Sequence, residues 1–325
     1  MQFADILPQL WPSLIWPLIR LIFFISVGLL VANFIESLNW TSKIATLARP
    51  LIRIGNLSET AGASFSMALF SGISANTMLS EAYAKKTISK KELILSNLFN
   101  SLPTYFLHLP TVFFITAPLI KGAAIIYVGI TFGAAIFRTV SIVILSRFLL
   151  PTVEKTTTQQ SGTATPGDKK IDWRGALDKS WKRFKKRIRK IIRFTVPIYI
   201  LIFLMHRVGL FEVLEAGMAD YLSFLPWLTP QSMSIITLHI AAEFTAGLAV
   251  AGALLQEGSM DYREVVLALL VGNVLSSPVR AIRHQFPYYA GIFQPKMAVE
   301  LIVYNQVFRI GSLILMGCIY FVITL

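Results

Sequence analysis

The sequence has few of the features on which soluble and disulfide-stabilised proteins depend. Charged residues make up 14% of its 325 residues, against about 25% in a typical soluble domain. A single cysteine, Cys318, excludes an intramolecular disulfide and a zinc site built from several thiolates. The sequence also contains no phosphate-binding glycine loop, no serine nucleophile elbow and no zinc-ligand spacing. We therefore expect neither an enzyme nor a bound metal or cofactor.

Apolar residues are abundant instead, at 55% of the chain, and the mean hydropathy is +0.64. Apolar runs of about 20 residues, each long enough to cross a bilayer, recur along the chain. They predict an all-α polytopic membrane protein. Residues 1–13 lack the basic region and the small-residue cleavage site of a signal peptide. We therefore expect the first apolar run, 14–35, to be kept as a membrane span.

The net charge of +13 is concentrated in one segment. Between Asp168 and Arg193, twelve Lys and Arg residues against three Asp residues account for +9 of it. Apolar residues recur there every three or four positions, which predicts a helix with a basic face and an apolar face. Such a helix is typical of binding to anionic lipid headgroups; a protein partner is the weaker alternative, and nucleic acid is not expected. The residues expected at the lipid surface are Trp173, Trp181, Lys182, Arg183, Lys185 and Lys186.

The sequence contains an internal repeat with a period of roughly 171 to 181 residues. PLIRLIFFISVGLL from Pro17 resembles PIYILIFLMHRVGLF from Pro197, and TISKKE resembles SMDYRE further along each half. IFRTVSIVIL then resembles VFRIGSLILM, which aligns Arg138 with Arg309. We expect a first repeat at 1–150, a polar linker with the basic helix at 151–193, and a second repeat at 194–325.

The distribution of basic residues predicts the topology. Lys and Arg flank 61–84 on both sides, so both ends of that segment are expected on the cytoplasmic side, as in a re-entrant hairpin. Spans at 14–35, 93–119 and 122–150 give the first half three crossings. An odd number of crossings inverts the second repeat relative to the first. The linker 151–193 is then cytoplasmic, in a multi-pass protein of the cytoplasmic (inner) membrane.

Polar residues inside the apolar runs mark the candidate site, because polar groups in hydrocarbon are costly unless they face a cavity or a partner. Two proline-containing segments, 96–110 and 273–287, are predicted as broken helices, tolerated where the freed carbonyls line protein or water. The alternative is that Asn and Ser hold helices together and Pro kinks them. The candidate substrate-binding residues are Ser74, Asn76, Asn97, Asn100, Ser101, His108, His239, Glu243, Thr245, Asn273, Ser276, Ser277, Arg280, Arg283 and His284.

Charged residues receive separate roles within this set. Arg280 and Arg283 are candidates for an anion clamp, with snorkelling towards an interface as the alternative. Glu243 is a candidate site for a coupling proton or cation, or a candidate partner of Arg309 or Arg138. His239 lies four residues earlier, but these two residues alone do not predict a metal site. Arg138 and Arg309 either belong to the site or satisfy carbonyls at the broken helices.

These residues resemble a known family. The stretch from Ser66 to Leu145, SMALFSGISANTMLSEAY through NLFNSLPTYFLHLP to IYVGITFGAAIFRT, looks like the nucleoside-recognition or Gate domain, and 273–315 looks like a second copy. That domain occurs in spore maturation proteins A and B, in ferrous-iron transporters and, in related form, in concentrative nucleoside transporters. The resemblance implies re-entrant hairpins and unwound helices around a polar site, with nucleosides as one candidate solute.

Together these patterns predict a membrane transporter or channel-like protein. It would move a small polar or anionic solute through a midplane site between two inverted repeats, each with three spans, a re-entrant hairpin and a Pro-broken helix. The alternative is a membrane scaffold or assembly factor that transports nothing. Self-association into a homo-oligomer stays open.

Overall fold

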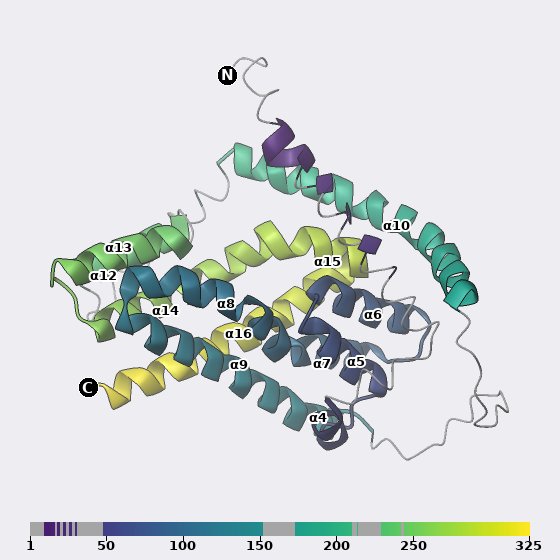
Figure 1. Ribbon diagram of the computed structural model, residues 1–325, viewed down its shortest axis with the longest axis horizontal. Coiled ribbons are helices and arrows are strands. Elements are labelled where there is room, and N and C mark those ends of the chain that lie inside the picture. Colours follow the sequence, from purple (N-terminus) through teal and green to yellow (C-terminus); the bar gives the residue numbers. More distant parts are fainter. Residues whose placement is uncertain are drawn as a thin grey trace. The chain divides into compact units, whose positions relative to one another are not determined.

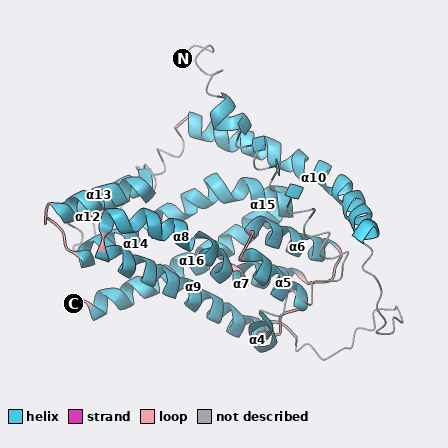
Figure 2. Cartoon of the chain, viewed as in Figure 1, coloured by secondary structure: helices cyan, strands magenta, loops and turns pink. Residues whose placement is uncertain are grey.

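The structure is a computed structural model that describes residues 48–151, 173–209, 229–241 and 244–325, with residue 213 and parts of 10–30. Every regular element in those residues is a helix (Figures 1 and 2). Contacts divide the chain into two units, each assembled from distant segments. Unit 1 comprises Met1–Ile19, Tyr105–Arg138 and Phe194–Leu325, and unit 2 comprises Arg20–Thr104 and Thr139–Arg193. The sequence-based domains at 1–150, 151–193 and 194–325 stay a prediction.

Unit 2 is built around a helical hairpin. Its helices before residue 100 are α4 (Arg49–Ile54), α5 (Glu59–Ala68), α6 (Gly72–Ala84) and α7 (Lys90–Phe99). Ser58, Ser71 and Ser89 begin α5, α6 and α7 by accepting a backbone N–H bond at each N-cap. The hairpin of α5 and α6 packs on α7 through small residues, many of them fully buried. Small side chains let these backbones approach closely, as in membrane helix interfaces.

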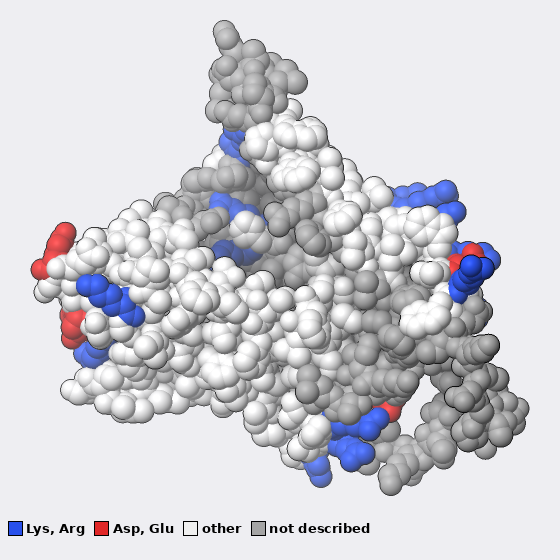
Figure 3. Space-filling view, in the orientation of Figure 1, with Lys and Arg blue, Asp and Glu red and all other residues white. Residues whose placement is uncertain are grey.

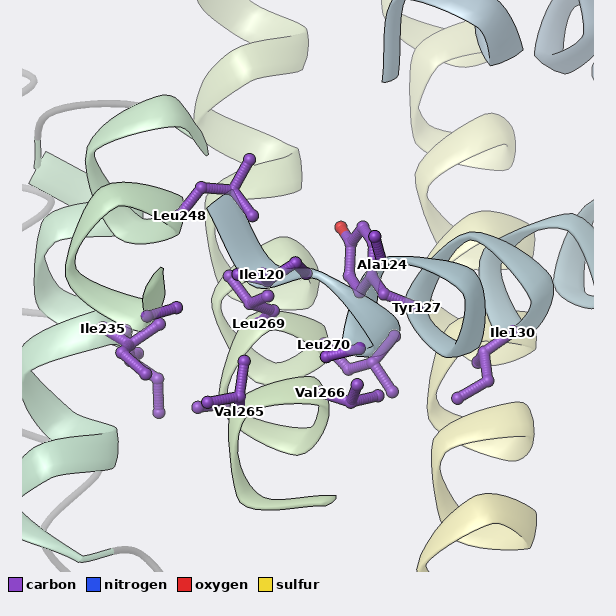
Figure 4. Close-up of a cluster of buried hydrophobic side chains, with 14 of the residues drawn as sticks. Ile120, Ala124, Tyr127, Ile130, Ile235, Leu248, Val265, Val266, Leu269 and Leu270 are labelled. Carbon is purple, nitrogen blue, oxygen red and sulfur yellow. The ribbon is translucent and has the colours of Figure 1, made fainter. Parts of the chain in front are cut away.

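Unit 1 contains the larger apolar core. The helices that contribute to it are α8 (Ser101–Ile120), α9 (Gly122–Leu149), α12 (Pro230–Ala241), α13 (Phe244–Gln256), α14 (Tyr262–Arg280) and α16 (Pro295–Ile323). The π-helical η5 (Ala281–Gln285) and α15 (Phe286–Phe293) lie between α14 and α16 along the chain, and α8 begins and α9 ends in unit 2. Figure 4 shows Ile120 and Tyr127 packed with Leu269 and Leu270. Leu248 joins them from the hairpin of α12 and α13, which therefore docks on α14.

Four helical stretches are long and apolar enough to cross a membrane: Lys90–Ile120, Gly122–Leu149, Tyr262–Phe293 and Pro295–Ile323. The first two confirm the helices expected at 93–119 and 122–150. Large apolar side chains on them are exposed, including Phe114 at 74% and Phe148 at 79%. Such surfaces are stable in lipid and unstable in water. The run expected to span at 14–35 lies mostly outside the described residues.

The order and lengths of the helices recur in the two halves. Helices begin at Glu59, Gly72, Lys90 and Gly122, and again, after nearly the same number of residues in each case, at Pro230, Phe244, Tyr262 and Pro295. The paired spans have 31 and 28 residues in the first half and 32 and 29 in the second. A residue with positive φ separates each pair of spans, Lys121 at 49° and Gln294 at 71°. A recurrence of helix order and length at a fixed spacing is expected after duplication of a segment. The inverted orientation and the re-entrant hairpins stay predictions.

The two proline-containing helices are interrupted but not unwound in the described ranges 90–120 and 262–293. In the first, α7 ends at Phe99 and α8 begins two residues later, and the Thr104 N–H still donates to the Asn100 carbonyl over 3.1 Å. In the second, a π-helical turn follows Pro278. Proline lacks a backbone N–H, and a local change in helix pitch accommodates the missing hydrogen bond. Both segments therefore remain helical.

The basic segment belongs to one long helix. α10 runs from Trp173 to Arg207 with Pro197 inside it, so the predicted amphipathic helix continues directly into the next apolar run. Residues 152–172, which include most of the predicted linker, lie outside the described residues. The boundary expected between a surface helix ending at Arg193 and a span opening at Pro197 is therefore not seen.

Candidate functional site

Two arginines donate to one buried amide in unit 1, and a third arginine lies within electrostatic range of one of them. Arg138 lies on α9, Arg280 at the end of α14 and Arg309 on α16, and all three are half-buried. Asn273 lies on α14 and is 7% exposed. We call these four residues the arginine cluster. The two arginines related by the sequence repeat thus lie in one unit with a third.

Asn273 uses both ends of its amide. Its Oδ1 accepts from Arg280 Nη2 at 2.6 Å and from Arg309 Nη2 at 3.4 Å, while its Nδ2 donates to the Tyr127 hydroxyl at 3.0 Å. Its backbone carbonyl accepts a second bond from Arg280 Nη2 at 3.3 Å. Because all these partners lie on helices that could cross a membrane, the amide orients two guanidinium groups inside an apolar layer.

Arg138 and Arg309 are poorly satisfied. Arg138 Nη1 donates to Ser312 Oγ at 3.3 Å, and its Nε is buried without an acceptor in the described part of the chain. Arg309 makes a long bond to Asn273, its only hydrogen bond to another described side chain, and lies within electrostatic range of Arg138 and of His108. A guanidinium carries five N–H donors. No carboxylate among the described residues forms an ion pair with either arginine.

The remaining polar residues of α14 and η5 are divided between the interior and the surface. Ser277 Oγ donates to Gln306 Oε1 on α16 at 2.6 Å, and Ser276 Oγ lies 3.5 Å from the Asn273 carbonyl. Arg283 is half-buried and His284 is exposed. Arg280 shares the Asn273 amide with Arg309, and the anion clamp of Arg280 and Arg283 stays a prediction.

His239 is enclosed rather than open to a solute. It is completely buried on α12, its ring centroid is 5.3 Å from that of Phe244, and neither ring nitrogen has a hydrogen-bond partner among the described residues. Gly272 and Gly247 touch it so closely that a Cβ built on either would lie 2.7 or 2.8 Å from a His239 atom. Thr245 is exposed on α13, and Glu243 lies outside the described residues.

The candidate residues of unit 2 hydrogen-bond mainly to one another. Asn97 Nδ2 donates to Asn76 Oδ1 at 2.8 Å, joining α7 to α6, and Asn100 Nδ2 donates to Ser64 Oγ on α5 at 2.7 Å. Ser74 Oγ lies 3.0 Å from Ser71 Oγ at the start of α6. Further along, Ser101 Oγ donates to the Leu98 carbonyl at 2.6 Å. These hydrogen bonds hold the hairpin of α5 and α6 against α7, as expected for polar residues that stabilise the packing of helices.

Several residues of these networks were not candidates from the sequence: Ser64, Tyr127, Gln306 and Ser312. Tyr127 lies in an apolar run, and no neighbouring sequence pattern marks it as a candidate functional residue. Ser312 follows Arg309 by three residues, the Phe-Arg and Ser pattern that both repeats share. His108, a predicted ligand, is exposed on α8 within electrostatic range of Arg309. Within the described ranges, no three His, Cys, Asp or Glu residues could hold a metal.

The basic helix exposes both of its faces. Trp173, Leu177 and Trp181, four residues apart, are 46%, 57% and 47% exposed. Trp181 stacks on Phe184 with centroids 5.2 Å apart, and Lys185 Nζ lies 5.4 Å from the Trp181 ring. Lys182 pairs with Asp178 at 2.6 Å. The side chains of residues 183 and 186 lie outside the described part; basic side chains of α10 stand at the right of Figure 3.

The described residues form a helical protein with four stretches long and apolar enough to cross a membrane. The sequence is similar to three proteins of Methanocaldococcus jannaschii: uncharacterized protein MJ1556, 28% identical over 305 residues and 92% of each chain, uncharacterized protein MJ0880, 24% identical over 322 residues, 96% of this chain and 97% of that one, and uncharacterized protein MJ0871, 24% identical over 291 residues and 88% of each. No protein-family model and no solved structure matches the chain. The similarity to these relatives covers most of each chain.

Proposed function

We propose that this protein is a membrane transporter or channel-like protein for a small polar or anionic solute. In this proposal the segments from α5 to α9 and from α12 to α16 are Gate-type repeats inserted in opposite orientations. Each repeat contributes a re-entrant hairpin and an interrupted helix, and the solute binds near the bilayer midplane. The matching order and lengths of the helices support the duplication.

The observation that carries the proposal is the arrangement of the arginine cluster. A charge held within apolar spans is costly to the fold, so such residues generally mark a solute or ion path. Arg280 and Arg309 both point a donor at Asn273 Oδ1. Tyr127 fixes the other end of that amide, so the groups are held in place before a solute arrives.

A second candidate function is a membrane scaffold that transports nothing. The observation favouring it is the mutual hydrogen bonding of Asn76 with Asn97 and of Asn100 with Ser64, which engages the unit 2 amides in packing. A scaffold needs no solute site. The arginine cluster of unit 1 then has no explanation, and for that reason we place transport first.

The proposed setting is the cytoplasmic membrane, with α10 on its inner surface. The exposed Trp173, Leu177 and Trp181 form an apolar stripe beside Lys182 and Lys185, which suits contact with anionic headgroups. Homo-oligomers are compatible with the proposal and are not needed by it.

Thermal unfolding of the purified protein, screened against nucleosides, organic anions and inorganic anions, tests transport against scaffold. We expect at least one solute to raise the unfolding temperature of the wild type, because a ligand that binds only the folded state stabilises it. Arg280→Ala should remove that increase and leave the unliganded protein folded. If no solute acts on the wild type and Arg280→Ala only lowers the unfolding temperature, the scaffold is the better description.

A further inference from the structure

Resting on the proposed function, we propose that Arg138 and Arg309 form the binding site for a small oxyanion with two negative charges. The proposal names the substrate class of the arginine cluster. It starts from the position of the two guanidinium groups along their helices, continues with their unused donors, and ends with the lack of an acidic partner among the described residues.

Both arginines lie far from the ends of their helices. Arg309 is the middle residue of α16, which runs from Pro295 to Ile323. At a rise of 1.5 Å per residue it lies about 21 Å from either end. An arginine side chain cannot reach across that length to an interface, so snorkelling does not account for it. Arg138 lies in the interior of α9, which ends at Leu149.

The hydrogen bonds of the two arginines use few of their donors. Within the part of the chain that the structure describes, Arg138 has one bond of 3.3 Å to the Ser312 hydroxyl, and Arg309 has one bond of 3.4 Å to the Asn273 amide. Both acceptors are neutral and both distances are long for N–H···O bonds. Each guanidinium therefore retains N–H donors that can form the planar, bidentate hydrogen bonds that carboxylate, phosphate and sulfate groups accept.

The two charges are close enough to repel one another. Arg309 acts electrostatically on Arg138, and no Asp or Glu within the described ranges pairs with either. Tyr105 and Tyr127, which also lie in electrostatic range of Arg309, are neutral hydroxyl groups. Two cations in apolar surroundings that have no acidic partner among the described residues are stabilised most by a ligand that brings two negative charges. A neutral nucleoside would leave both charges uncompensated.

Equilibrium binding of radiolabelled sulfate to the purified full-length protein at constant ionic strength tests the proposal. Sulfate is a dianion, and direct binding avoids its general stabilising effect on proteins. We expect saturable binding to the wild type, unaffected by matched chloride or by uridine. Arg138→Gln and Arg309→Gln should each weaken it about tenfold or more, the loss expected for one charge-assisted contact. Arg309→Lys keeps the positive charge but loses the bidentate donor geometry of the guanidinium. Its affinity for sulfate should therefore lie between that of the Gln variants and that of the wild type.

Arg147→Gln is the matched control, because Arg147 is an exposed arginine near the end of the same helix, α9. It should bind sulfate within about twofold of the wild type, as expected for a surface charge. Equal weakening by Arg147→Gln and Arg309→Gln would overturn the proposal, since it would show only general attraction of anions. Absence of saturable sulfate and phosphate binding to the wild type would overturn it as well, whether or not the variants fold.

Two further arms separate the source of the oxyanion and the fate of the proposed function. Displacement of sulfate by inorganic phosphate supports a free solute, and displacement by phosphatidic acid but not by phosphate supports a lipid headgroup with the same chemistry. If uridine stabilises the protein and sulfate does not bind, the proposed oxyanion site is wrong and the proposal of transport stands. If no probe binds, both proposals fail.

Discussion

The close contact between Gly272 and His239 predicts a large effect from a single methyl group. A Cβ built on Gly272 lies 2.7 Å from His239 Nδ1, 2.8 Å from Cγ and 3.0 Å from Cβ. The His239 side chain has no room to turn away, because it is completely buried and a Cβ built on Gly247 would lie only 2.8 Å from His239 Cβ. Gly272→Ala must therefore push α14 away from α12.

The size of the effect follows from two opposing terms. Overpacking a buried site costs about 1–3 kcal/mol, and three close ring and Cβ contacts place Gly272→Ala towards the upper end. Replacing Gly by Ala in a helix gains about 1 kcal/mol. The expected net loss is about 2 kcal/mol in the free energy of unfolding. Gly129→Ala is the matched control, since Gly129 lies within α9 and nothing stands within 4 Å of its Cβ position.

Unfolding of the detergent-solubilised protein by increasing fractions of sodium dodecyl sulfate measures both variants. Gly129→Ala should unfold at the wild-type midpoint or above it, and Gly272→Ala clearly below. In a His239→Ala background, Gly272→Ala should cost much less, because the two nearest atoms it meets, Nδ1 and Cγ, are gone and only Cβ at 3.0 Å remains. Equal midpoints for the two alanine variants would refute the packing argument.

Three further expectations concern other parts of the chain. Asn97→Ala should lower the free energy of unfolding by about 1–3 kcal/mol, with or without a solute, because Asn76 Oδ1 loses its buried donor; an unfolding midpoint unchanged from wild type would mean that the pair is not structural. With the native cysteine replaced by serine, Lys85→Cys and Glu257→Cys follow α6 and α13 at corresponding places, and an impermeant thiol reagent added outside should label only the second; labelling of both from one side would exclude inverted repeats. Replacing the four basic residues within 182–186 by Gln in a 169–193 peptide should weaken binding to anionic vesicles by about 1 kcal/mol per charge, measured by vesicle sedimentation, and hardly change binding to neutral vesicles.

Helices and their ends were readable from the sequence, because they depend on nearby residues. The apolar runs predicted spans at 93–119 and 122–150, and the structure has Lys90–Ile120 and Gly122–Leu149. The start of α14 illustrates this local dependence. The Asp261 side chain accepts from the Glu264 N–H, and the Glu264 side chain accepts from the Asp261 N–H, so two residues three positions apart form a capping box. Hydrophobic length and local capping suffice to place such elements.

Which polar residues would meet depended on the tertiary structure. Asn273 bonds Tyr127 across 146 residues, and Arg138 bonds Ser312 across 174. Spacing along a helix determines which residues share a face, but not which face of another helix packs against it. The sequence therefore indicated Arg138, Asn273, Arg280 and Arg309 as unusual in apolar runs. Only the packing of α14 and α16 brought Arg280 and Arg309 to the Asn273 amide, and only that of α9 and α16 brought Arg138 to Ser312. The closeness of α12 to α14 placed His239 against Gly272, because helix contacts depend on the shapes of surfaces far apart in the sequence.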